Sequence, residues 1–198
     1  MNVFCGRWLL ALLMGVSGAC VADLITLQDL EESPVPTLQA DTRCSLSVSN
    51  PVVDYGIMSR WQLEDMGTGS VSPGTRSLTV SVVCSYSRTM SLRVEGEGSE
   101  GRLRYGQHGS ARLRLLDAQL DGNTVELCTV TSTGVIIESG GHRLALNAGQ
   151  RQAPVIQGRL AEGKTLTVRL EIQPILAESD ARVSSRQHSE TVLTLILD

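Results

Sequence analysis

A glycine-rich stretch in the middle of the chain has the letters of a nucleotide-binding loop. Residues 96–101 read GEGSEG, which fits the pattern G-x-G-x-x-G and follows the strand-like segment SLRVE. In dinucleotide-binding proteins, this loop opens a helix whose N-terminus holds the pyrophosphate. Here the strand-like segment RLRYG follows instead, and Glu97 and Glu100 would repel a phosphate. We therefore predict a hairpin loop and no nucleotide.

The three histidines, His108, His142 and His188, could serve as metal ligands or acid–base groups. Each lies in a separate loop-like segment, without the close ligand spacing of a structural metal site. No serine stands in a nucleophile elbow, and Cys128 has no neighbouring base. The sequence leaves open whether the histidines converge in space. We expect no metal site, no cofactor and no catalytic site, so the chain is predicted not to be an enzyme.

Four arginines could form a basic surface. Arg102, Arg104, Arg112 and Arg114 alternate with apolar residues on two strand-like segments, so one face of a predicted hairpin is basic. We expect this face to be the solvated side of a half-buried sheet. A patch for an acidic ligand is the alternative.

The N-terminus has the features of a secretory signal peptide. The segment MNVFCGR carries one positive charge, WLLALLMGV is apolar but too short to span a bilayer, and SGACVA supplies small residues before a cleavage site. We expect residues 1–22 to be removed, with lipoprotein processing at Cys20 as the alternative. Removal of Arg7 leaves 16 basic against 21 acidic residues, a net charge of −5, which argues against a nucleic-acid partner.

Three cysteines remain after this cleavage, and an exported protein is expected to oxidise a pair of them. Cys44 and Cys84 each lie at the edge of a strand-like segment, so we predict a disulfide between them. Closing this loop would restrict the unfolded chain by roughly 4 kcal/mol in the entropic account. Cys128 alternates with Val and Leu in TVELCTV and is predicted to be a buried apolar residue, although the odd cysteine could also be free or paired with another chain.

Most of the chain after residue 43 alternates with the period of two that is typical of β-strands. The predicted strands are SLTVSVVCSYS, TMSLRVE, RLRY, ARLRLL, TVELCTV, VIIE, RLAL, TLTVRLEIQPIL and TVLTLIL. Only QDLEE and LLDAQL could hold a turn or two of helix. Residues 44–198 are therefore predicted to form one all-β sandwich with an aliphatic core, preceded by an acidic extension at residues 23–43.

The last predicted strand is apolar on both faces. Leu193, Leu195 and Leu197 share one face, and Val192 and Ile196 share the other. Such a strand must lie deep in a sheet or be covered by a partner. If it is an edge strand, it is suited to strand addition from another chain.

Together these features resemble a chaperone-usher pilus (fimbrial) subunit. The resemblance covers residues 44–198 and rests on the signal peptide, the acidic extension, Cys44 opening a strand, Asp54-Tyr55-Gly56 closing the next, SLTVSVVC around Cys84, GEGSEG after SLRV, and the closing QPIL and TVLTLIL. It implies an immunoglobulin-like sandwich that lacks its last strand. A hydrophobic groove for a chaperone strand or donor strand would then lie open beside Val192, Leu193, Leu195 and Leu197.

The resemblance also implies the partners and the location. A periplasmic chaperone would fill the groove first, and the extension of another pilus subunit would replace it at the outer-membrane usher. Ile25 and Leu27 would be the donor residues of this chain. The implied function is a structural fimbrial subunit that supports cell adhesion, exported to the periplasm and then displayed at the cell surface, with no small-molecule substrate. A fimbrial tip adhesin that binds a host glycan or receptor is the alternative.

Overall fold

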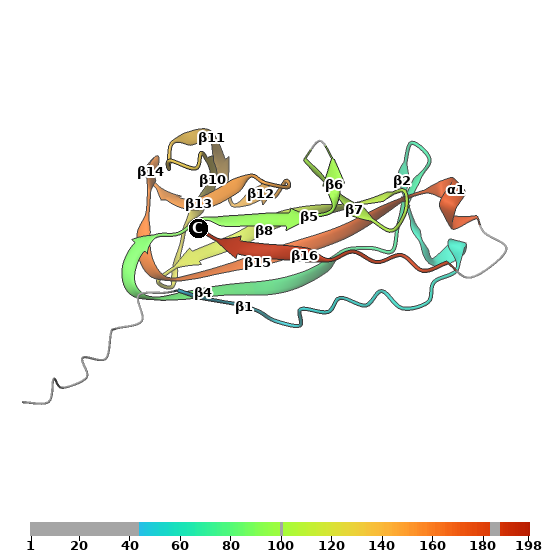
Figure 1. Cartoon of the computed structure of the whole chain (residues 1–198), viewed down its shortest axis with the longest axis horizontal. Coiled ribbons are helices and arrows are strands. Elements are labelled where there is room, and N and C mark those ends of the chain that lie inside the picture. The colour runs from blue at the N-terminus through green and yellow to red at the C-terminus, as the bar shows by residue number, and fades with distance from the viewer. Residues whose placement is uncertain (1–43, 100, 183–186) are drawn as a thin grey trace, which may run out of the picture. The chain divides into compact units, whose positions relative to one another are not determined.

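Two antiparallel β-sheets stacked face to face make up this computed structural model, which describes residues 44–99, 101–182 and 187–198 (Figure 1). All of these residues belong to one compact unit. The predicted signal peptide (1–22), the predicted extension (23–43) with Ile25 and Leu27, and the possible helix in QDLEE lie outside the described residues.

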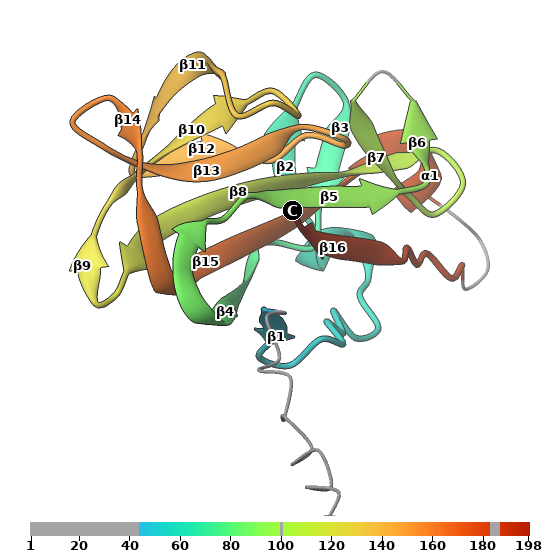
Figure 2. The same cartoon turned by 60° about the vertical axis from the view of Figure 1, so that its left-hand side comes forward.

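The first sheet contains the longest strands (Figure 2). Its order is β1-β4-β15-β8-β7-β6; β12 and β9 also pair with β8, and the β2–β3 hairpin extends from β15. The bounds are β1 Ser45–Val48, β2 Glu64–Gly67, β3 Ser70–Ser72, β4 Arg76–Thr89, β6 Gly98–Ser99, β7 Arg102–Tyr105, β8 Gly109–Leu120, β9 Asn123–Thr124, β12 Arg143–Ala145 and β15 Glu162–Ala177.

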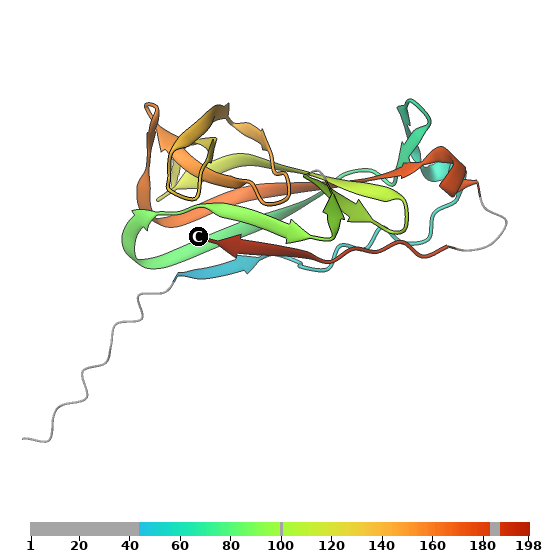
Figure 3. The ribbon, with the colours of Figure 1, turned by 45° about the horizontal axis from the view of Figure 1, so that its top comes forward.

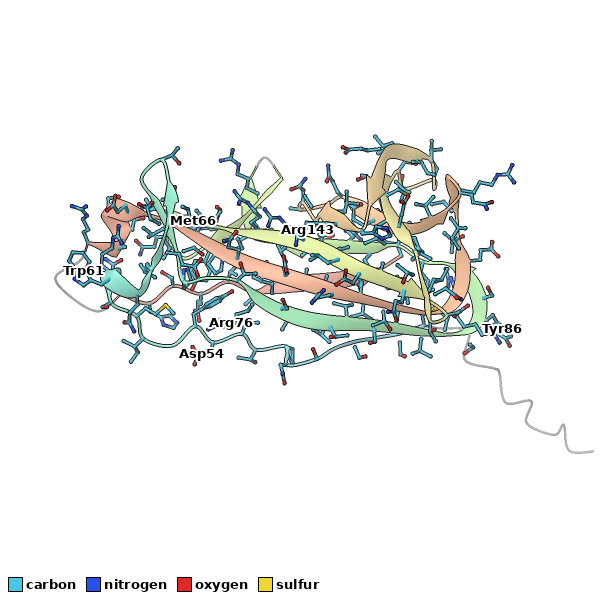
Figure 4. The ribbon with its side chains drawn as sticks, turned by 180° about the vertical axis from the view of Figure 1, so that it is seen from behind. Asp54, Trp61, Met66, Arg76, Tyr86 and Arg143 are labelled. Atoms are coloured by element: carbon cyan, nitrogen blue, oxygen red, sulfur yellow. A yellow bond between two sulfur atoms is a disulfide. The ribbon has the colours of Figure 1, made fainter. Side chains whose placement is uncertain are left out.

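The second sheet is shorter and has the order β11-β10-β13-β5-β16, with β14 added to β13. Its bounds are β5 Leu92–Gly96, β10 Glu126–Val130, β11 Ile136–Gly141, β13 Arg151–Ile156, β14 Arg159–Leu160 and β16 Leu193–Leu197. A 3-10 helix, η1 (Arg60–Gln62), and an α-helix, α1 (Glu178–Ala181), lie near the β2–β3 hairpin, at the opposite end from Tyr86 (Figure 4).

The core between the sheets is aliphatic, as predicted. Side chains alternate along each strand, so one face of β4 and one face of β15 supply buried residues while Ser77, Thr79 and Thr167 point to solvent. The largest fully buried core side chains include Met90, Leu92, Leu103, Leu115, Leu127, Leu146 and Leu166.

The strand order is that of an immunoglobulin-like sandwich. In that fold, strands A, B, E and D form one sheet and strands C, F and G form the other. The first sheet contains the neighbours β1-β4-β15-β8, which take the places of strands A, B, E and D. The second sheet contains the neighbours β5-β16, which take the places of strands C and F. No described strand takes the place of G beside β16. The predicted fold class is confirmed.

Three local predictions differ from the structure. LLDAQL is not helical but forms the second half of β8, where Asp117 (φ 50°) makes a β-bulge that interrupts the alternation. Residues 51–59 contain no strand before Asp54-Tyr55-Gly56; instead the Gly56 N–H donates to Asp54 Oδ1 (2.7 Å) with Gly56 at φ 72°.

The third difference is β13, which the sequence pattern does not predict because it contains Pro154. The Pro154 carbonyl accepts a hydrogen bond from Ala161 N (3.0 Å), so its backbone points away from β10. On that side β5 pairs only with Arg151 and Gln152. The N–H that Pro154 lacks would point to the same side as its carbonyl, so no bond to β10 is lost.

The disulfide predicted between Cys44 and Cys84 is present, with a Cα–Cα distance of 4.1 Å and a sequence separation of 40. It continues the β1–β4 register, in which Ser45 lies opposite Val83. Because β1 has only four residues and one neighbour, the disulfide is the main covalent restraint on this edge strand.

Replacing both Cys44 and Cys84 by Ala should lower the free energy of unfolding by roughly 2–4 kcal/mol, because the unfolded chain regains the entropy of an open loop. Urea denaturation would measure the loss. Reductant should destabilise the parent chain and leave the double variant unchanged. A parent chain whose unfolding curve does not respond to reductant would contradict the stabilising role of the bond.

Candidate functional site

Among the strands that the structure describes, β16 has a neighbour on one side only. It pairs with β5 in the register Leu193 opposite Gly96 through Leu197 opposite Leu92. It stands at the end of its sheet, and within residues 44–99, 101–182 and 187–198 no other strand pairs with it. We call the unpaired side of Leu193–Leu197 the open edge.

The hydrogen bonds of β5 and β16 show which backbone groups face the open edge. Ser91 and Asp198 exchange both N–H···O bonds, at 3.2 and 2.9 Å. In an antiparallel pair, hydrogen-bonded residues alternate with residues whose N–H and C=O point away from the partner. The alternate set here is Leu193, Leu195 and Leu197, so their backbone groups face the open edge.

The same three leucines point their side chains into the sandwich. Leu193, Leu195 and Leu197 are half-buried and pack against the main core, whereas Thr194 is exposed. Val192, which was predicted with them, precedes β16 and is 81% exposed. Alternation along an extended chain places it on the outer side with Thr194.

A matching apolar row lies on β1. Leu46 and Val48 are half-buried against the same core, opposite Val82 and Val80 of β4. Ser49 N donates to Thr79 O (2.9 Å), so by the same alternation the backbone groups of Leu46 and Val48 also face away from β4. Figures 1 and 3 show β1 and β16 along the same side of the sandwich.

These two rows define the candidate site. Two apolar strands from opposite sheets present unpaired backbone groups on the same side, and no ladder joins them among the described strands. The arrangement can bind an extended polypeptide, which would satisfy the backbone groups and cover the half-buried leucines. The described residues of the two rows supply no nucleophile, general base or metal-ligand set.

Asp198 fixes the end of β16. Its carboxylate accepts hydrogen bonds from Arg93 Nε (3.1 Å) and Arg151 Nε (2.9 Å). The hydrogen bond from Arg93, and to a smaller extent the one from Arg151, holds the pKa of the Asp198 carboxyl below its ordinary value. Since a shift of β16 along β5 would break both contacts, Asp198 helps to set the register of the open edge.

Two tyrosines lie at the other end of the sandwich. Tyr55 OH donates to Ile172 O (3.0 Å), and Arg76 lies 5.4 Å from the Tyr55 ring centre. Burial raises the pKa of Tyr55 to about 12 and also raises that of Tyr105, which packs against the main core. The DYG segment therefore anchors the chain after β1 through the Tyr55 hydroxyl.

The other residues singled out in the sequence do not meet at one site. His108 lies 3.5 Å from Asp180 and His188 lies 3.1 Å from Glu190, with histidine side chains 71% and 82% exposed. His142 is also exposed. Among the described residues, no three His, Cys, Asp or Glu side chains gather as a metal site would require.

Cys128 is fully buried, as predicted, and burial raises the pKa of its thiol. It belongs to a second, small apolar cluster with Val130, Ala153 and Val155. Gly98 and Ser99 of the GEGSEG stretch form β6 and pair with β7, as in a hairpin. The four arginines of the predicted basic face lie on the outer side of β7 and β8, since Leu103, Leu113 and Leu115 between them are buried.

Three site residues, Leu46, Val48 and Asp198, are not among those predicted from the sequence. The alternation in SLSV is the signal for the first two, because it places them on one face directly after Cys44. The contacts of Asp198 have no local signal, since Arg93 and Arg151 come from strands far away in the sequence.

Comparison with known proteins gives a distant structural likeness. The chain is similar to the P pilus rod subunit PapA, with 15% sequence identity, a TM-score of 0.37, and coverage of 78% of this chain and 97% of that one. No family model and no curated protein sequence matches the chain. At this identity and TM-score the likeness establishes neither family nor function. Across the described residues, no helix has the length and apolar character needed to cross a bilayer.

Hydrogen exchange should distinguish alternate residues of β16. The amides of Leu193, Leu195 and Leu197 face the open edge and should exchange about tenfold faster, or more, than those of Thr194 and Ile196, which donate to β5. Residue-resolved NMR exchange on the isolated chain would measure this. Uniform protection along β16 would mean that the open edge is already paired.

The stability of the protein should depend on the ionisation of Asp198. Because its folded pKa is lowered from 3.8, its contribution is fully present above that value and is lost as the pH falls through the lower folded pKa. Asp198→Asn should therefore flatten the dependence of the melting temperature on pH below about 5. Glu162→Gln, at an exposed carboxyl on β15, is the control and should keep the parent profile. An Asp198→Asn profile that matches the parent would argue against the two arginine contacts.

Proposed function

We propose that this chain is a structural subunit of a chaperone-usher fimbria and that it accepts a strand from another polypeptide at the open edge. The observation that carries this proposal is the combination at Leu193, Leu195 and Leu197 of unpaired backbone groups with half-buried apolar side chains. Such an edge is a liability for a free protein, because it invites uncontrolled pairing. A protein that uses the edge for assembly gains from the same feature.

The energetics favour a stable assembly without covalent chemistry. An added strand would bury the inward faces of the β16 leucines and of Leu46 and Val48 together with its own side chains. With four or five incoming apolar side chains at about 1.5–3 kcal/mol each, the gain is on the order of 10 kcal/mol. Backbone hydrogen bonds to the open edge would also fix the direction and the register of the added strand.

The proposal includes the partners and the route. A periplasmic pilus chaperone would cover the open edge during export, and a neighbouring pilus subunit would replace it at the outer-membrane usher. The finished subunit would lie in a cell-surface fimbrium that supports adhesion. This role requires no cofactor and no catalysis, so the chain is proposed not to be an enzyme.

Leu195→Asp should abolish capture by a co-expressed pilus chaperone, because the substitution places a charge under the incoming strand at an apolar site. The matched control is Thr194→Asp, which adds the same charge one residue away on the exposed face of β16. Co-purification from the periplasm would measure capture. Equal capture of both variants would show that the open edge is not the docking site.

The state of the full chain without a chaperone gives a second test. Expressed alone in the periplasm, it should aggregate or be degraded, because the open edge has no partner. Addition of a synthetic peptide of residues 23–43 during refolding should raise the melting temperature if this extension can donate a strand. A stable, soluble monomer whose melting temperature does not respond to chaperone or peptide would overturn the proposal.

A further inference from the structure

Trp61 has the most exposed large apolar side chain among the described residues, at 92%. It is the middle residue of the 3-10 helix η1 and lies at the end of the sandwich opposite Tyr86 (Figure 4). Tryptophan is enriched at the centres of protein interfaces, where its ring covers a large area. Its exposure here therefore leaves a large apolar ring available to a partner.

The neighbours of Trp61 hold the helix in place. On one side, Arg60 Nη2 donates a hydrogen bond to Glu178 Oε1 of α1 (2.7 Å). On the other side, Ser59 N donates to Gln62 Oε1 (2.8 Å), and Gln62 N donates to Ser59 O (3.0 Å). The two residues that flank Trp61 thus fix the backbone and leave the indole ring exposed. A ring on a backbone that is already fixed loses less conformational entropy when a partner covers it.

The opposite end of the sandwich carries an exposed tyrosine beside the disulfide. Tyr86 is 55% exposed and follows Cys84 by two residues on β4, so both side chains lie on the same side of that strand. Cys84 is bonded to Cys44, where the described part of the chain begins. Residues 23–43 are therefore joined to the sandwich at the Tyr86 end.

The open edge is oriented along the line between these two ends. Asp198 exchanges backbone hydrogen bonds with Ser91, which follows β4 closely, so β16 finishes at the Tyr86 end. The chain before Leu193 comes from the Trp61 end, where α1 lies (Figure 1). A strand added antiparallel to β16 would run in the opposite direction, so its C-terminal end would leave at the Trp61 end.

We propose that neighbouring copies of this chain form a head-to-tail contact, in which the Trp61 end of one copy packs against the Tyr86 end of the next. This inference rests on the proposed function, because it takes the added strand from residues 23–43 of the second copy. When that strand runs antiparallel to β16, its chain continues into the second copy at the Tyr86 end of that copy. The two ends are thus linked, and the indole ring of Trp61 packs on the surface around Tyr86.

The direction of the added strand decides between two arrangements. A parallel strand would bring the Tyr86 ends of two copies together and leave Trp61 in water. An antiparallel strand as long as β16 uses five of residues 23–43, and the others span at most about 50 Å, so the second copy stays near the Trp61 end. Because the contact joins two different surfaces and every copy has both, it repeats along a fibre.

The fluorescence of Trp61 tests the contact, because the other tryptophan of the chain, Trp8, belongs to the predicted signal peptide. The mature chain is refolded at low and at high concentration, and monomers are separated from oligomers by size. In oligomers the emission should move to shorter wavelength, and quenching by acrylamide should fall at least about threefold, since interface centres exclude water.

The outcomes separate this contact from strand addition. Oligomers in which Trp61 is quenched as in the monomer would overturn the contact and leave strand addition intact. A chain that stays monomeric at every concentration would overturn both. Protection of Trp61 in a chaperone complex but not in oligomers would assign this surface to the chaperone and overturn the contact between copies.

Paired cysteine variants identify the surface that covers Trp61. A Trp61→Cys chain mixed with a Tyr86→Cys chain should give linked dimers with a short bismaleimide cross-linker. In the control mixture, Thr79→Cys, at an exposed residue in the middle of β4, replaces Tyr86→Cys and should give none. Efficient linking of the Tyr86→Cys chain to itself would indicate the parallel arrangement, and equal linking in the control would indicate random collision. Either result would overturn the proposal.

Substitution of the ring completes the test. Trp61→Ala should keep the melting temperature of the parent monomer, because the side chain is exposed, and should weaken oligomer formation at least about tenfold. Trp61→Phe retains an aromatic ring and should assemble more tightly than Trp61→Ala. Oligomers of Trp61→Ala that form at the parent concentration would show that the ring makes no contact.

Discussion

The structure depends on one unsatisfied constraint: a β-strand has two hydrogen-bonding sides, and within the described part of the chain β16 uses only one of them. Backbone N–H and C=O groups are too strongly polar to be covered by apolar material without a partner. At the same time, the leucines of β16 are too apolar to be left to water without loss of stability. An extended polypeptide meets both requirements at once, so the open edge suits binding to another chain rather than catalysis.

The rest of the fold holds this edge in a defined geometry. β15 is the centre of the first sheet and pairs with β4 and β8 along most of its length, which makes that sheet a firm support. The disulfide holds β1 beside the candidate site, and Asp198 holds the end of β16 on its other side. Two different kinds of restraint thus act at two edge strands, each of which has a single neighbour.

Much of the fold could be predicted from the sequence because its strands are half-buried and therefore alternate clearly, as TLTVRLEIQPIL does. The prediction is wrong where local chemistry breaks the alternation. At Asp117 a bulge interrupts the strand period, so LLDAQL was a possible helix in the sequence. At Asp54 a turn stands where a strand was predicted. The missing prediction of β13 has a related cause, since Pro154 is tolerated where its backbone faces away from β10. Contacts such as that of Asp198 with Arg93 and Arg151 need the three-dimensional register and leave no trace in a linear pattern.

The alternation at β16 also restricts the sequence of any strand that pairs antiparallel with it. Residues directly opposite each other in such a pair have their side chains on the same face and exchange their hydrogen bonds at the same positions. In a strand added beside Leu193, Leu195 and Leu197, one set of alternate residues would therefore fill the interior. The same residues would donate their N–H groups to the open edge. Proline or an N-methylated residue is consequently forbidden at every buried position of that added strand.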